Sequence, residues 1–227
     1  MKHFGLIGKK LEHSWSAQYF SAKFAAEGID ADYRLFELDN AALAPQLGLD
    51  GYNITIPYKT VILPYLQELD PIAAEINAVN VVMNGKGYNT DWIGFKQSLS
   101  EIMHSRNIEL KNALILGQGG AAKAVNYALK LMNIPAKTIS AREKIEMDLR
   151  QYDLIVNATP LGMFPNIETC PDMDYQMLCE KQVLFDCVYN PEETEFLRRG
   201  KARGAITING KRMLLIQAEE SWKIWNN

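Results

Sequence analysis

The 227-residue sequence predicts an α/β protein of two lobes, and two observations carry this prediction. Short apolar runs alternate with stretches of helical spacing along the whole chain, which is typical of folds that cover a sheet with helices. Near the middle, the apolar run 112–116 breaks into the glycine-rich turn 117–120, after which an amphipathic helix begins. A chain with 48% hydrophobic residues can bury the core of one large domain or of two smaller ones.

The glycine-rich turn has the composition of a phosphate cradle. Gly117 would permit a tight turn, and Gly119 would let the backbone approach a pyrophosphate. Gly120 and the small Ala121 would open a helix whose first amides face the anion. An ordinary connection between a strand and a helix also uses glycine, so the motif by itself leaves both interpretations open. We expect a dinucleotide site here.

The overall charge and hydropathy favour a small-molecule partner. The net charge is −3 and the Lys and Arg residues are scattered, so no basic stripe predicts nucleic-acid binding. No apolar run approaches the roughly 20 residues of a membrane-spanning helix, and the first residues lack the long apolar centre of a signal peptide. We therefore expect a cytoplasmic protein without a membrane partner, and the sequence leaves monomer and homodimer open.

Cysteine and histidine usage predicts neither disulfides nor a metal site. The cysteine count is odd and no C-x-x-C spacing occurs, which argues against a disulfide framework or a zinc knuckle and fits a reducing cytoplasm; the residues are Cys170, Cys179 and Cys187. The histidines lie far apart in the sequence without paired ligand spacing, at His3, His13 and His104. We expect no metal.

The first lobe alternates predicted strands and helices. Apolar alternation and proline positions indicate strands at 3–8, 32–38, 51–57 and 78–82. Helical spacing indicates helices at 17–28, 40–47, 58–69 and about 92–106, and Pro64 is expected to divide or kink the third of these.

Polar residues stand where these predicted elements begin and end. Ser14 and Ser16 flank one residue before a helix, where a serine acts as an N-cap or two hydroxyls bind a carboxylate. Asn53 and Thr55 share one face of a strand and Lys59 follows after Pro57, so three polar groups either converge or form a solvated edge. Context must decide between these interpretations.

A second polar cluster follows in the same lobe. Asn80 lies in a short apolar strand, and Asp91 stands immediately before a predicted helix. The simplest role for such an aspartate is that of an N-cap. The alternative is a role in a polar site together with the preceding cluster.

The second lobe, residues 94–209, reads as a doubly wound parallel sheet. Strands are expected at 112–116, 136–140, 153–157, 182–186 and 205–208, and helices at 120–132 and 193–202. The segment 158–181 is expected to be a long loop, because Gly162, Pro165 and Pro171 exclude a regular element. Such a sheet with a glycine turn after its first strand is a Rossmann-type dinucleotide-binding domain.

The end of the second strand bears on the choice of dinucleotide. NAD-binding folds usually place an acidic residue there for the ribose 2′-hydroxyl, whereas this chain has Ser140-Ala141-Arg142. Arg142 therefore favours the 2′-phosphate of NADP, although a solvated surface arginine is also compatible with the sequence. NAD remains possible.

The C-terminal segment 210–225 is a predicted helix with an apolar stripe. Met213, Leu214 and Ala218 recur at helical spacing and should lie in the core. Gln217 lies within the same stripe, and an amide on an apolar face needs a polar partner.

Together these residues resemble the shikimate dehydrogenase family. The matching pieces follow one another in family order along nearly the whole chain: Ser14 with Ser16, Asn53-x-Thr55-x-Pro57-x-Lys59, Ala78-Val-Asn80, Asn89-Thr90-Asp91, the glycine turn, Asn157-Ala-Thr-Pro-Leu-Gly-Met163, Asp186-x-x-Tyr189-Asn-Pro191 and Gly210-x-x-Met213-Leu214-x-x-Gln217-Ala218. Each piece alone is weak, but their shared order is difficult to obtain by chance.

The resemblance implies the reversible NADPH-dependent reduction of 3-dehydroshikimate to shikimate, a step towards chorismate and the aromatic amino acids. It implies a catalytic pair, Lys59 and Asp91. It also implies a substrate site formed by both catalytic residues and Ser14, Ser16, Asn53, Thr55, Asn80, Tyr189 and Gln217. The implied cofactor contacts are Gly117, Gly119, Gly120, Ala121, Ser140, Arg142, Thr159, Cys187, Gly210 and Met213.

The family pattern also implies the domain layout. Residues 1–93 would form the substrate-binding and catalytic domain, which the returning C-terminal helix 210–227 completes, and residues 94–209 would bind the dinucleotide. The active site would then lie in the cleft between the lobes.

Some residues depart from the family pattern. The chain is short for the family, Ala17 stands where proline is common, and the usual Asn-Arg-Thr is absent around Arg142. Cys187 replaces a methionine that commonly lies beside the nicotinamide. These departures keep two alternatives open: a quinate/shikimate dehydrogenase that uses NAD or both cofactors, and a catalytically silent dinucleotide-binding module. Retention of Lys59, Asp91 and Gln217 argues against the silent module.

Overall fold

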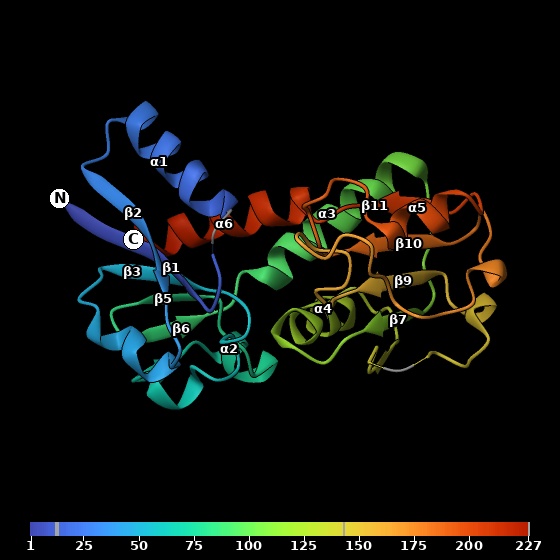
Figure 1. The fold of residues 1–227 in the computed structure, drawn as a ribbon, viewed down its shortest axis with the longest axis horizontal. Coiled ribbons are helices and arrows are strands. Elements are labelled where there is room, and N and C mark those ends of the chain that lie inside the picture. Colours follow the sequence, from blue (N-terminus) through green and yellow to red (C-terminus); the bar gives the residue numbers. More distant parts are fainter. Residues whose placement is uncertain (12–13, 143, 227) are drawn as a thin grey trace. The chain divides into compact units, whose positions relative to one another are not determined.

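A computed structural model describes residues 1–11, 14–142 and 144–226. The chain forms two compact units (Figure 1). The first unit comprises Met1–Thr90 and Ala218–Asn227, and the second comprises Asp91–Gln217. No helix among the described residues is long and apolar enough to cross a membrane.

The first unit is built on a mixed six-stranded sheet in the order β2-β1-β3-β5-β6-β4. Its strands are β1 (Lys2–Gly8), β2 (Ala31–Glu37), β3 (Gly51–Ile54), β4 (Glu68–Leu69), β5 (Val81–Met83) and β6 (Lys86–Tyr88). Strand β1 pairs in parallel with β2 and β3, whereas β5 runs antiparallel to β3 and β6. The parallel half of this sheet therefore needs crossover segments, and helix α1 (Trp15–Glu27) supplies the first.

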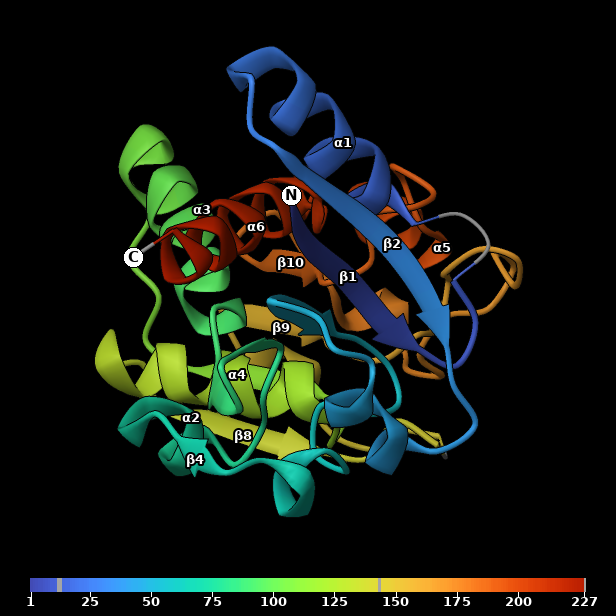
Figure 2. The same ribbon diagram turned by 90° about the vertical axis from the view of Figure 1, so that its left-hand side faces the viewer.

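Two apolar clusters cover the two faces of this sheet. On one face, aromatic rings of the sheet and of α1 pack with Trp225 of helix α6 (Lys211–Trp225), and the rings of Phe4 and Trp225 stack at 4.8 Å. Figure 2 shows α1 lying along β1 and β2. The other face is covered by the short 3₁₀ helices η1 (Ala41–Gln46) and η2 (Leu63–Tyr65) and by α2 (Pro71–Ile76). The second half of α6 thus belongs to the first unit.

The second unit holds a fully parallel five-stranded sheet in the order β11-β10-β9-β7-β8. The strands are β7 (Ala113–Leu116), β8 (Ala136–Ile139), β9 (Leu154–Asn157), β10 (Val183–Asp186) and β11 (Ile206–Ile208). Each lies within a strand that the sequence predicted. In the sheet, β7 lies between β8 and β9. The chain therefore adds β8 on one side of β7 and the later strands on the other, so the strand order reverses at β7.

Alternate side chains of these strands point into two separate cores. Ala113 and Ile115 of β7 pack with helices α3 (Asp91–Arg106) and α4 (Gly120–Leu131). Leu114 and Leu116 pack on the opposite face, with α5 (Glu195–Lys201) and the single turns η3 (Leu149–Gln151) and η4 (Tyr175–Met177). The sheet is therefore covered on both faces, as in a doubly wound fold.

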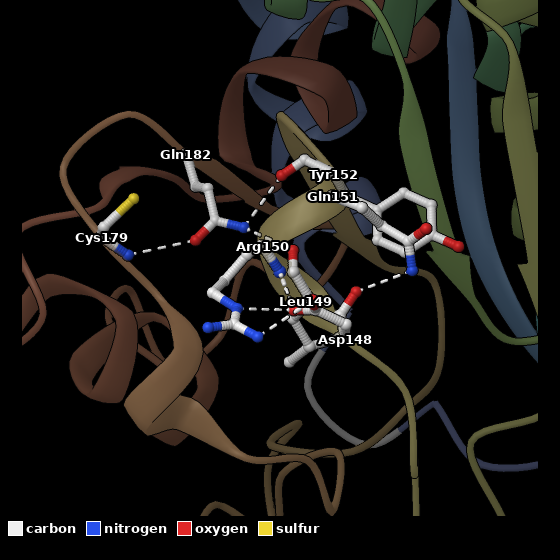
Figure 3. A network of polar contacts seen from close by, with 7 residues as sticks. All are labelled: Asp148, Leu149, Arg150, Gln151, Tyr152, Cys179 and Gln182. Atoms are coloured by element: carbon white, nitrogen blue, oxygen red, sulfur yellow. Dashed lines mark hydrogen bonds and ion pairs between the residues drawn. The ribbon is translucent and has the colours of Figure 1, made fainter.

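The crossover from β8 to β9 contains no α-helix in its described part. Its end is held instead by the buried side chain of Gln182, which donates hydrogen bonds of 2.8 Å to the carbonyls of Leu149 and Tyr152. The side-chain carbonyl of Gln182 accepts from the amide of Cys179 at 3.1 Å, and Asp148 caps the turn at Arg150 (Figure 3). These contacts satisfy backbone groups that a helix would otherwise satisfy within itself.

The structure corrects the predicted helix 58–69. This segment forms turns, the single turn η2 and strand β4, with Ile62 buried between them. Pro57 and Pro64 leave too few residues between them for a stable helix, because proline neither donates a hydrogen bond nor tolerates a helical neighbour before it.

Two further predicted strands are shorter than expected, and a hairpin was missed. Strand β3 ends at Ile54 rather than at residue 57, and β5 begins at Val81 rather than at residue 78. The hairpin of β5 and β6 turns at Asn84 and Gly85, both with positive φ, at 50° and 74°. Asn-Gly between short apolar runs is a strong local hairpin signal that could have revealed it.

Candidate active site

The paired serines lie at the start of α1. Ser14 precedes the helix with extended backbone angles and makes no capping hydrogen bond through its side chain within the described residues. Ser16 lies inside the first turn and is buried, so it is not the N-cap. The preceding Glu12 and His13 lie outside the described residues. The capping interpretation is therefore wrong for Ser16, and neither hydroxyl is committed to a helix cap.

Asn53 lies at the centre of a buried hydrogen-bond network in the first unit. Its side-chain carbonyl accepts from the Tyr33 hydroxyl at 2.8 Å. Its amide donates to the Asn80 carbonyl at 3.1 Å and to the Ser221 hydroxyl at 3.0 Å. The side chain thus joins β2, β3, the start of β5 and α6. Ser221 is fully buried, and the sequence had predicted no role for it in the site.

Asn80 continues this network towards the start of α3. Its side chain donates to the Thr90 hydroxyl at 2.9 Å and accepts from the Thr90 amide at 2.7 Å. The Thr90 and Ser221 hydroxyls lie 3.4 Å apart. The residues that the sequence placed in a substrate site, Asn53 and Asn80, are therefore also part of the scaffold of this unit. A substrate contact for either one remains a prediction.

The segment that carries Thr55 and Lys59 is fixed by backbone hydrogen bonds. The amide of Thr55 donates to the carbonyl of Ile7 at 2.9 Å, and the amide of Val79 donates to the carbonyl of Lys59 at 2.7 Å. Both Thr55 and Lys59 are half-buried. Lys59 is thus tied to the residue that precedes Asn80, which brings the two predicted polar clusters of this unit together.

Asp91 opens the second unit. It is the first residue of α3 and is 4% exposed. The dipole of a helix favours a carboxylate in its first turn, where backbone amides point towards it. Asp91 is therefore a buried acidic side chain at the N-terminus of α3.

In the second unit, the glycine turn joins β7 to α4. Gly117 follows β7 with φ at 122°, and a Cβ there would lie 2.9 Å from the Ala158 carbonyl oxygen. At Gly119, a Cβ would meet no described atom within 4 Å beyond its own neighbours, and α4 begins at Gly120. Gly119 thus leaves open space beside the start of α4, at the point where the strand order reverses.

The residues expected at the ribose lie after β8, beside this turn. Ser140 and Arg142 are exposed, and the Arg142 amide lies 3.4 Å from the Ser140 hydroxyl. Strand β8 pairs in parallel with β7, so their carboxyl ends share one edge of the sheet. An arginine at this edge suits a phosphate on the ribose.

The carboxyl ends of β9 and β10 are joined by two buried polar side chains. The Asn157 amide donates to Asp186 at 3.0 Å, and its side-chain carbonyl accepts from the amide and hydroxyl of Thr159 at 3.1 and 2.6 Å. Asp186 also accepts from the Val188 amide at 2.9 Å and from the Thr194 hydroxyl at 2.5 Å. Asp186 and Asn157 are fully buried.

Burial raises the pKa of Asp186 from 3.8 to about 7, because charge is costly in an apolar surrounding, while its three hydrogen-bond donors act in the opposite direction. In the sequence, Asp186 formed part of a motif without a predicted role of its own. The sequence signal that could have indicated such a role is an acidic residue at the end of an apolar strand.

Two other glycines in this unit mark close backbone approaches. A Cβ on Gly210 would lie 2.4 Å from the Cys187 carbonyl oxygen, and one on Gly94 would lie 2.5 Å from the Met213 carbonyl oxygen. Only glycine fits at either position without a shift of the backbone. The residues expected beside the nicotinamide, Cys187 and Gly210, are therefore in direct contact.

The remaining predicted residues of this unit lie near its end and in a loop. Met213 is buried in the core with α3 and α4. Gln217 is 9% exposed and donates to the Leu214 carbonyl of its own helix at 2.9 Å, and Tyr189 is half-buried after β10. Among the described residues, no group of three or more His, Cys, Asp or Glu side chains could hold a metal ion.

Known proteins are similar to this chain along nearly its whole length. The family model for the shikimate dehydrogenase substrate binding domain matches residues 6–82. Shikimate dehydrogenase (NADP(+)) of Methanocaldococcus jannaschii is 37% identical over 258 aligned positions, which cover 99% of this chain and 91% of the relative. These positions outnumber the residues of this chain, so the relative has residues that this chain lacks.

Solved structures are similar to this chain over nearly its whole length. Shikimate 5-dehydrogenase of Thermus thermophilus, in complex with NADP(H) and shikimate, has a TM-score of 0.84 and 28% identity, covering 99% of this chain and 93% of that one. Quinate dehydrogenase of Corynebacterium glutamicum, in complex with NAD, has a TM-score of 0.80 and 29% identity, covering 99% of this chain and 93% of that one. With a relative above one-third identity along nearly its full length, the chain belongs to the shikimate dehydrogenase family.

Proposed function

We propose that this protein is a shikimate dehydrogenase that catalyses the reversible NADPH-dependent reduction of 3-dehydroshikimate to shikimate. One observation carries the proposal: similarity to NADP-dependent shikimate dehydrogenases extends over 99% of the chain, which has both Lys59 and Asp91. The residues at the glycine turn fit the cofactor, because Gly119 leaves room for a phosphate and Gly117 has a backbone that favours glycine.

When bound, NADPH would supply the hydride for the ketone carbon, and the protein supplies alignment and electrostatics. The Lys59 ammonium group stabilises negative charge that develops on the ketone oxygen and donates a proton to it. Asp91 orients the reacting hydroxyl and keeps the lysine ammonium in place. Both steps need Lys59 protonated and Asp91 ionised in the reducing direction.

The other expected residues hold the two ligands. Ser14 and Ser16 bind the substrate carboxylate at the start of α1, where the helix dipole favours an anion. The substrate hydroxyls and ring are bound by Asn53, Thr55, Asn80, Tyr189 and Gln217. The dinucleotide is bound by the glycine turn and Ala121, by Ser140 and Arg142 at the ribose phosphate, and by Thr159, Cys187, Gly210 and Met213 on the nicotinamide side.

The proposal extends to the functional domains and to the setting of the reaction. Residues 1–93 with 210–227 form the substrate domain, and residues 94–209 form the cofactor domain. We place the enzyme in the cytoplasm because its three cysteines are free, which suits a reducing compartment. Whether the protein acts as a monomer or a homodimer stays a prediction.

The test is absorbance at the nicotinamide band when purified protein receives shikimate or quinate, each with NADP or NAD. Turnover confined to shikimate and NADP supports the proposal and the role of Arg142. Turnover with quinate or NAD would replace it with the broader quinate/shikimate activity. Cofactor binding without turnover on any substrate would indicate a silent dinucleotide-binding module.

A further inference from the structure

The connection between Asp186 and the loops around it extends across the carboxyl edge of the second sheet. One Asp186 oxygen accepts from Asn157 at the end of β9 and from the Val188 amide after β10. The other oxygen accepts from Thr194, which is the N-cap of α5. Three separate segments therefore end on one fully buried carboxylate.

Asn157 passes this constraint on to the loop that follows β9. Its side-chain carbonyl holds both the amide and the hydroxyl of Thr159, and the Thr159 hydroxyl in turn accepts from the Leu161 amide at 3.1 Å. The Asn157 backbone carbonyl accepts from the Cys187 amide at 2.9 Å. Asp186 thus positions Thr159 through the side chain of Asn157. Cys187 is held in two ways: it follows Asp186 in the chain, and its amide is bonded to the Asn157 carbonyl at the end of β9.

The same loop contacts the glycine turn. A Cβ on Gly117 would lie 3.1 Å from both the Ala158 carbonyl carbon and the Thr159 methyl carbon. Asp186 touches none of the proposed ligand contacts except its neighbour Cys187, so any effect on the cofactor must act through these intermediates.

We propose that Asp186 is a positioning residue for the nicotinamide half of the cofactor site, acting through Asn157 on Thr159 and through the chain on Cys187. The inference rests on the proposed function, because Thr159 and Cys187 are assigned to the cofactor there. The adenosine half, at Ser140, Arg142 and the first turn of α4, lies on other strands and is not connected to Asp186 by these hydrogen bonds.

This difference between the two halves gives the test. Asp186→Leu removes the acceptors for Asn157, Val188 and Thr194 and leaves buried donors unpaired. We expect it to raise the Kd of NADPH about tenfold and to leave the Kd of adenosine 2′,5′-bisphosphate, which occupies the adenosine half alone, within about twofold of wild type. Both constants are measured by calorimetric titration of the full chain.

Three further variants make the result decisive. Asp186→Asn keeps an acceptor for Asn157 and Val188 and should restore NADPH binding to within about threefold of wild type. Asp174→Leu is the matched control, because Asp174 caps η4 at Gln176 and lies outside the network; it should leave both constants unchanged.

Asn157→Ala removes the side-chain hydrogen bonds that join Asp186 to Thr159 and to the Leu161 carbonyl, and it leaves the bonds of Asp186 to Val188 and Thr194 in place. It should reproduce the selective loss, so it decides the question if Asp186→Leu does not fold.

Equal weakening of both ligands would indicate a general structural role and overturn the inference, as would unchanged NADPH binding in Asp186→Leu or in Asn157→Ala. Failure of the proposed function appears differently, as the absence of NADPH binding or of shikimate turnover in the wild-type protein.

Discussion

The two units use a buried asparagine in similar places but give it different partners. Asn53 lies next to the end of β3 and contacts a tyrosine hydroxyl, a backbone carbonyl and a serine hydroxyl. Asn157 ends β9 and donates to the carboxyl group of Asp186. The same side chain therefore ties strand ends together through neutral groups in one unit and through an ionisable group in the other. The first network should be insensitive to pH and the second should not.

The consequences for stability follow from the raised pKa of Asp186. A carboxyl group whose pKa is about 7 in the folded protein and 3.8 when exposed binds its proton more tightly in the folded state. Between these values the folded state holds the extra proton, so the free energy of unfolding falls as pH rises from about 4 to 7. The sign is opposite to that of a carboxylate stabilised by a salt bridge.

The largest expected effect is on kcat, from a substitution in the first unit that should leave cofactor binding unchanged. Lys59→Ala should lower kcat by about 10²- to 10⁴-fold, because the group that stabilises and protonates the alkoxide is removed. The Kd of NADPH should stay within about twofold. Steady-state kinetics and cofactor titration measure both quantities, and wild-type turnover in this variant would remove Lys59 from the catalytic role.

The next effect tests the ionisable network directly. Wild-type protein should lose up to about 4 kcal/mol of unfolding free energy through Asp186 between pH 4 and 7, whereas Asp186→Asn should lose none through this position. Urea unfolding of both proteins at several pH values gives the difference. A difference that does not change with pH would show that the pKa of Asp186 is not raised.

The neutral network should respond without any pH dependence. Ser221→Ala leaves one buried amide hydrogen of Asn53 without its acceptor and should lower the unfolding free energy by about 2 kcal/mol. The loss should be the same at every pH between 5 and 8. A loss that varies over that range would contradict the contrast between the two units.

The smallest effect sharpens the comparison within the cofactor unit. Arg142→Ala should weaken NADPH binding about tenfold more than NADH binding, because only NADPH carries the 2′-phosphate. Its unfolding free energy should not change, since Arg142 is exposed. Equal weakening of both cofactors would exclude Arg142 as the 2′-phosphate contact.

Much of the architecture could be predicted from the sequence, because the local spacing of apolar residues and glycines indicates strands, helices and turns. Each strand of the parallel sheet is a short apolar run, and the glycine turn specifies its own backbone at Gly117. The helix expected at 58–69 does not form, because Pro57 and Pro64 interrupt the helix that the apolar spacing of this segment suggests.

The sequence by itself thus determined the fold class, the order of the polar motifs and the position of the glycine turn after β7. Only the tertiary structure decided what holds those motifs in place. Asn53 meets Ser221 across 168 positions of the chain, and Asn157 meets Asp186 across 29. Such contacts leave no periodic pattern in the sequence, because a buried polar side chain takes its partner from whichever segment the packing of the core brings within hydrogen-bond distance.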